Sequence, residues 1–342
     1  MIELKKNHLV FSFPEVHKRA TLSIDFKRTL RIPDDGETHH LPPGLGSFPV
    51  RHVDDHAAKV PSDWLQRGGV MLPMYQSEAL WICFGGGGWG RSGTGYPFAI
   101  KIATGKINAV TGETWKPELT KKPQDYVVSP TQPWLDGYCV EKGTIRQFVA
   151  MPLGAGYTAE EQLTGEAEHG GLQLLVYPMK AEAWERVRAE RKEREVEWLS
   201  ADSRMRVCCA ATDMGLAPGG KMRQEIYDDP YSIEDWDLEH SSRCFVHIAN
   251  SMVWQSITGS QPPSPPPTSK QYTDAGLPWF DYYAEGETAV EGADKLAGMK
   301  SVKEMGEAKG DVPLPENETV TPENVVALRK QLAKNQVREG AF

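Results

Sequence analysis

Short apolar runs that alternate with polar residues constrain the fold of this chain more than any other feature. Leu22, Ile24 and Phe26 occupy alternate positions with polar residues between them, and a period of two is typical of a strand with one buried face. Gly and Pro, at 32 and 25 of 342 residues, separate many such runs. Many short strands between turns are typical of an antiparallel sandwich or barrel. Further runs lie at 9–13, 79–84, 98–102, 107–110, 145–150 and 172–177.

Strands and long helices do not alternate along the chain, which argues against a doubly wound parallel sheet. The sequence predicts a mainly β fold of the α+β class, with an antiparallel β-sandwich-like body, peripheral helices and a C-terminal extension. Two local signals support particular elements of this body. Thr104 and Gly105 separate two β-type runs and predict a tight hairpin with Gly105 at positive φ. Thr158 and Glu161 have the spacing of a capping box at a helix start.

Helix-type patterns appear in the second half of the chain. Residues 181–200, rich in Glu and Arg, predict a surface helix, and residues 238–257 predict an amphipathic helix that ends at Gly259. The Pro-rich stretch that follows predicts an extended linker. We therefore expect a β-rich body with surface helices over 1–259, a linker over 260–270 and a C-terminal arm over 271–342.

The arm begins with a dense aromatic segment that would be unfavourable to leave in water. A short helix is expected at 295–305, and Thr321 followed by Pro322 predicts the start of a terminal helix. We expect the aromatic segment to dock on the body of the same chain or on a protein partner, which includes a second copy. Its members are Leu277, Trp279, Phe280, Tyr282 and Tyr283.

Charge and cysteine content restrict the class of protein. With 38 basic and 47 acidic residues the net charge is −9, which argues against nucleic-acid and polybasic membrane-surface binding. No apolar run approaches the ~18 residues of a membrane-spanning helix, and no apolar segment follows the lysines of the N-terminus, so we expect no secretory signal. Five cysteines without a Cys-x-x-Cys pair favour free thiols and a cytoplasmic location.

Two clusters are candidates for chemistry. Glu166, Glu168 and His169 precede a predicted strand, and carboxylates beside an imidazole are suited to general acid–base catalysis or metal binding. A solvated turn is the simpler interpretation of the same residues.

The second cluster lies on the predicted helix over 238–257. His240, Cys244 and His247 share one side of that helix, and His and Cys are the ligand types that zinc prefers. The stripe would span about 16 Å along a helix, which is long for a single ion. A hydrogen-bonded, partly buried histidine face is the simpler alternative.

Two compositional features add little to the choice of function. Residues 84–95 are Gly-rich but lack the Gly-Lys-Ser/Thr of a Walker loop and the remaining kinase motifs, so we expect a connection between strands. Ten tryptophans are a high number, and exposed Trp can stack on sugar rings or other flat ligands.

The leading functional hypothesis is a non-enzymatic cytoplasmic binding or assembly protein with a docking C-terminal arm and no required cofactor. One alternative is a hydrolase-type enzyme that uses Glu166, Glu168 and His169, with zinc as a possible cofactor. A second alternative is a carbohydrate or small-ligand binder that uses surface tryptophans.

Overall fold

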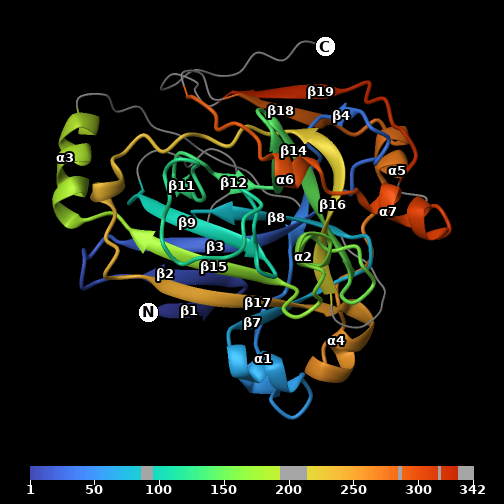
Figure 1. The fold of residues 1–342 in the computed structure, drawn as a ribbon, viewed down its shortest axis with the longest axis horizontal. Coiled ribbons are helices and arrows are strands. Elements are labelled where there is room, and N and C mark those ends of the chain that lie inside the picture. The colour runs from blue at the N-terminus through green and yellow to red at the C-terminus, as the bar shows by residue number, and fades with distance from the viewer. Residues whose placement is uncertain (86–94, 193–213, 284–286, 315–316, 330–342) are drawn as a thin grey trace.

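Seventeen of the strands that the structure describes form one connected β-sheet in the computed structural model of the protein (Figure 1). The structure describes residues 1–85, 95–192, 214–283, 287–314 and 317–329. One part of the sheet is a run of antiparallel neighbours. In order, these strands are β1 (Ile2–Lys5), β2 (His8–Ser12), β3 (Thr21–Thr29), β8 (Ala79–Phe84), β14 (Thr144–Pro152) and β16 (Met214–Arg223).

The second part of the sheet is also largely antiparallel. Its strands, in order, are β11 (Val127–Ser129), β9 (Phe98–Thr104), β15 (Leu172–Pro178), β17 (Ser242–Asn250) and β7 (Val70–Met74), of which the last two are parallel. The two parts meet where Met214 of β16 pairs with Ile248 of β17. The predicted mainly β, α+β class is confirmed, whereas the sandwich arrangement of the sheet stays a prediction.

Short strands and helices complete the fold. The remaining strands are β4 (Thr38–His39), β5 (Gly44–Ser47), β6 (Arg51–His52), β10 (Ile107–Asn108), β12 (Trp134–Leu135), β13 (Gly137–Glu141), β18 (Trp279–Tyr283) and β19 (Val325–Arg329). The helices are α1 (Ser62–Arg67), α2 (Ala159–Thr164), α3 (Ala181–Lys192), α4 (Ser251–Thr258), α5 (Ser269–Asp274), α6 (Asp294–Ala297) and α7 (Val302–Lys309), with 3-10 turns at Asp54–His56 and Ile233–Asp235.

Both local turn signals are confirmed. Thr104 of β9 pairs with Ile107 of β10 across a tight turn, and Gly105 has a φ of 55°. Thr158 caps α2, because its hydroxyl accepts from the Glu161 N–H while the Glu161 side chain accepts from the Thr158 N–H. These two signals position the site described below, since the hairpin and α2 both border it.

The helix predicted over 238–257 is wrong for most of its length. Residues Ser242–Asn250 form strand β17, and only Ser251–Thr258 are helical. The strand pairs with β15 along one edge and β7 along the other, and residues on both of its faces are buried. Such a strand lacks the alternation of a half-buried one, and a continuous apolar run cannot be distinguished from a helix by periodicity alone.

The predicted helices of the arm also require correction. Val325–Arg329 form strand β19, parallel to β18, because pairing with a formed strand outweighs the local start signal at Thr321 and Pro322. In place of one helix over 295–305, the chain forms α6 and α7, which are separated around Gly298. The expected Gly-rich connection at 86–94 and the end of the helix predicted over 181–200 lie outside the described residues.

The Pro-rich segment and the arm pack on the body of the same chain. The Arg28 guanidinium donates to the carbonyl of Ser264 (2.6 Å), and the Tyr75 hydroxyl donates to that of Pro263 (2.7 Å). Further along, Phe280 and Leu41 exchange backbone hydrogen bonds of 2.8 and 3.0 Å. The segment at 260–270 is therefore a docked connection. No helix among the described residues has the length and apolar character needed to cross a membrane.

Candidate functional site

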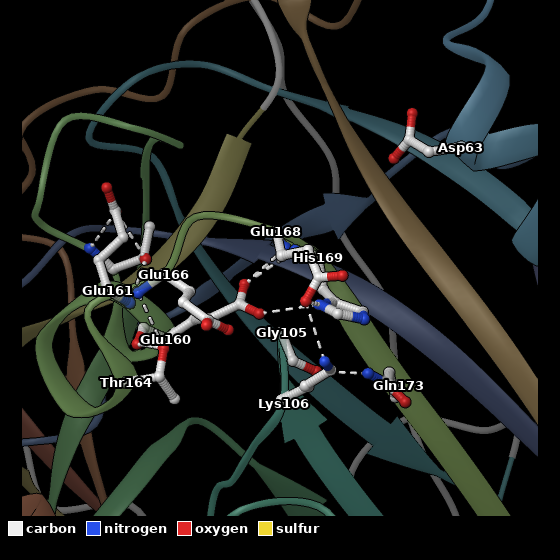
Figure 2. Close-up of polar contacts among 12 residues, drawn as sticks. Asp63, Gly105, Lys106, Glu160, Glu161, Thr164, Glu166, Glu168, His169 and Gln173 are labelled. Carbon is white, nitrogen blue, oxygen red and sulfur yellow. Dashed lines mark hydrogen bonds and ion pairs between the residues drawn. The ribbon is translucent and has the colours of Figure 1, made fainter.

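Two of the residues that the sequence suggests for catalysis, Glu168 and His169, lie in a cluster of polar contacts around Glu160 (Figure 2). Glu160 lies in the first turn of α2 and is only 2% exposed. One carboxylate oxygen accepts from the backbone N–H groups of His169 (3.2 Å) and Gly170 (2.9 Å), and the other lies 3.1 Å from Nδ1 of His169. A single buried carboxylate thus fixes both the backbone and the ring of the loop that precedes β15.

The β9–β10 hairpin closes against this carboxylate. A Cβ atom on Gly105 would lie 2.3 Å from a carboxylate oxygen of Glu160, and the positive φ of Gly105 also disfavours any side chain there. The Gln173 amide of β15 donates to the Gly105 carbonyl (2.6 Å). Glycine at position 105 is therefore what allows the hairpin and α2 to meet.

Charged side chains surround the pair on its outer side. Nζ of Lys106 lies 2.9 Å from the Glu168 carboxylate, which is itself 3.4 Å from Nδ1 of His169. Arg67, at the end of α1, pairs with Asp63 (2.9 Å) and donates to the Glu168 carbonyl (3.1 Å).

These charges act on the titration of the site. Burial lowers the pKa of His169 below its ordinary value, since a desolvated imidazolium is unfavourable. Glu160 opposes this effect, and the positive charges of Arg67 and Lys106 reinforce it. The hydrogen bond from Lys106 lowers the pKa of the exposed Glu168 carboxyl.

The structure brings together only part of the predicted catalytic cluster. Glu168 and His169 are neighbours, but Glu166 is exposed, and its N–H bonds to the Thr164 hydroxyl (3.1 Å) at the end of α2. The carboxylate that contacts the imidazole most directly is Glu160, nine positions before it. The only signal for Glu160 in the sequence is its place in the first turn after the Thr158 cap.

The three proposed metal ligands have separate environments. His240 precedes β17 and bonds to Asp237 (3.0 Å), whereas Cys244 and His247 lie within the strand three positions apart, a spacing that places them on opposite faces. The helical basis of this hypothesis is therefore wrong. Among the described residues no group of three or more His, Cys, Asp or Glu is placed to hold a metal ion.

His247 lies instead in a small apolar cluster between α1, α4 and β7. Its ring stacks on Trp64 with centroids 4.6 Å apart, and its Nε2 donates to the Gly68 carbonyl (3.0 Å). Burial lowers the pKa of His247 to about 4.

The predicted docking segment divides into buried and exposed members. Trp279 is fully buried and donates from its indole N–H to the Thr273 hydroxyl (3.1 Å), and the Tyr282 ring meets Trp134 edge-on at 4.8 Å. Phe280 is bonded through its backbone to Leu41. Leu277, by contrast, is 46% exposed. Tyr283 ends β18, and its side chain lies outside the described part of the structure.

The tryptophans offer little surface for a flat ligand. Of those whose side chains are described, all but Trp115 are buried: Trp64, Trp81, Trp134, Trp184, Trp236, Trp254 and Trp279.

One buried acid was not anticipated. Asp136 accepts from the Trp134 indole (2.5 Å) and the Gln224 amide (2.8 Å), and burial raises its pKa to about 7. Nothing in the local sequence distinguishes Asp136 from a turn residue, because the Gln224 amide that contacts it lies 88 positions later.

Comparisons with known proteins identify no relative. No family model matches the chain, and no curated protein or solved structure is significantly similar to it.

Proposed function

We propose that the protein is a binding or assembly protein whose C-terminal arm presents an open strand edge to a second copy of the same chain. The observation that supports this proposal is the outer edge of β19. Within the described residues β19 pairs with β18 alone, and an unpaired edge is a ready template for another strand.

The orientation of the backbone follows from the register. The Trp279 N–H donates to the Asn324 carbonyl (2.9 Å), and Trp279 pairs with Val325. In a parallel pair the residues on either side of the paired one make the hydrogen bonds, so Asn324 and Val326 face β18. The N–H and C=O groups of Val325 and Ala327 consequently point away from β18.

The arm holds this edge in place. On its inner side β18 bonds to Leu41, and the side chain of its first residue, Trp279, is buried. These contacts support the two-stranded ribbon of β18 and β19, which would be unstable alone. Val325 is 37% exposed and Leu277 is 46% exposed, so apolar surface accompanies the open backbone groups. Figure 1 shows β18 and β19 along one margin of the molecule, away from α1 and α4.

A second copy is the occupant we favour because an edge strand can pair with itself across a two-fold axis, where the same groups donate and accept on both sides.

We also propose that the protein is located in a reducing, cytoplasmic compartment. Cys83, Cys139 and Cys244 are free and buried, as is common for proteins of such compartments.

The test replaces one outward-facing N–H. Ala327→Pro removes it while leaving the bonds between β18 and β19, because proline is tolerated at an edge position. Light scattering on the full chain should show a concentration-dependent dimer that Ala327→Pro reduces to a folded monomer. The matched control Ala327→Ser keeps the N–H and should dimerise normally. A native chain that is monomeric at every concentration, or an Ala327→Pro chain that still dimerises, would overturn the proposal.

A further inference from the structure

The two ring nitrogens of His169 have different roles. Both oxygens of Glu160 act as acceptors in the site, one of them for two backbone N–H groups, so Nδ1 donates to the other oxygen at 3.1 Å. A neutral imidazole carries one proton, which leaves the lone pair on Nε2. In the described part of the chain Nε2 makes no hydrogen bond, and Figure 2 shows it at the end of the ring that points away from Glu160.

The surroundings keep this lone pair available and the ring fixed. The His169 side chain is 13% exposed, so its outer edge meets solvent while Glu160 beneath it is almost fully buried. Burial, Arg67 and Lys106 disfavour protonation of the ring. A carboxylate on Nδ1 stabilises any positive charge that develops when Nε2 forms a bond, and does so strongly where water is excluded.

We propose that His169 is a nucleophilic site for activated carboxylic esters, with Nε2 as the attacking atom and Glu160 as the residue that positions it. This activity is separate from strand pairing at β19. Imidazole nitrogens are established covalent nucleophiles in proteins.

The proposed reaction has two steps. Nε2 attacks the ester carbonyl carbon, a C–N bond forms, and the ester C–O bond breaks as the alkoxide or phenolate leaves with the electron pair. In the acylimidazolium that results, the proton stays on Nδ1, which continues to donate its hydrogen bond to Glu160. Water then attacks the same carbon, the C–N bond breaks with its electron pair returning to Nε2, and one proton of the water passes to the solvent, where it balances the alkoxide or phenolate released in the first step. The carboxylic acid and the neutral imidazole are thereby regenerated.

The test uses p-nitrophenyl acetate with the full chain. We expect phenolate release and, after rapid quenching, an acetyl group on the peptide that contains His169. His169→Gln should lower the rate at least tenfold. The matched control is His240→Gln: His240 also bonds through Nδ1 to a carboxylate, Asp237, but its side chain is 42% exposed. The His240→Gln variant should react with p-nitrophenyl acetate at the same rate as the native protein.

A second variant tests the role of Glu160 by a readout other than rate. Because Glu160 raises the pKa of His169, Glu160→Gln should shift the midpoint of the pH–rate profile to lower pH as well as slow the reaction. A rate unchanged by His169→Gln, a rate lowered by His240→Gln or an acetyl group found elsewhere would each overturn the proposal. An unchanged midpoint in a folded Glu160→Gln protein would remove Glu160 from it.

Discussion

His169 and His247 differ in what each ring contacts. His169 bonds to a carboxylate and presents its second nitrogen toward solvent, whereas His247 lies between aromatic rings and donates to a backbone carbonyl. Burial lowers the pKa of both, yet only His169 has a buried acid that opposes the effect. The difference teaches that a lowered pKa does not by itself distinguish a histidine packed between aromatic rings from one held by a buried carboxylate.

The largest expected effect is on stability. His247→Ala should lower the free energy of unfolding by about 3 kcal/mol, because it leaves a cavity beside Trp64 and deprives the Gly68 carbonyl of its donor. His169→Ala should lower it by about 1 kcal/mol, since Glu160 retains two N–H donors. Urea unfolding at neutral pH measures both values. Equal losses of unfolding free energy in the two variants would show that the packing of His247 contributes no more to stability than the hydrogen bond of His169.

Acidification should sharpen the same contrast. The folded pKa of His247 is about 4 against about 6.5 in the unfolded chain, so below pH 6.5 the unfolded state binds more protons. The contribution of neutral His247 to the free energy of unfolding is therefore complete above pH 6.5 and falls by up to about 3 kcal/mol as the pH approaches 4. The stability difference between the native protein and His247→Gln should therefore narrow over this range. A constant difference would show that His247 titrates normally.

A smaller effect is expected at the hairpin that borders His169. Gly105→Ala places a Cβ against Glu160 and forces alanine to a positive φ, so stability should fall by about 2 kcal/mol. Because Glu160 is displaced, the p-nitrophenyl acetate reaction should also slow. Gly143→Ala supplies a control, since Gly143 has a similar positive φ and its nearest contact would be at 4.0 Å. Equal loss of reactivity in both variants would separate Gly105 from the site.

The sequence predicts elements that depend on neighbouring residues and fails for those that depend on distant ones. The hairpin at Gly105 and the cap at Thr158 are local signals, and both are present in the structure. Strand β17 was mistaken for a helix because its conformation depends on β7 and β15. Strand β16, with Gly and Pro in its interior, carries no local strand signal and forms by pairing with β14.

The candidate site shows the same division. His169 and Glu168 were identified because they are adjacent, and Glu160 was missed because a folded loop brings it to the ring. The metal hypothesis depended on a helical spacing that β17 does not have.

The buried ion pair of Arg28 and Glu78 has a consequence for the order in which the chain folds during synthesis. Glu78 lies 50 positions after Arg28 and is made early, but the Ser264 carbonyl that also accepts from this guanidinium lies 236 positions away. Until that segment leaves the ribosome, a cation in the centre of the sheet lacks one acceptor and the aromatic segment of the arm has not yet covered the body. Folding of the body is therefore completed only after the segment around Ser264 has been synthesised. Until then the apolar surface that the arm covers is exposed, and exposed apolar surface favours aggregation.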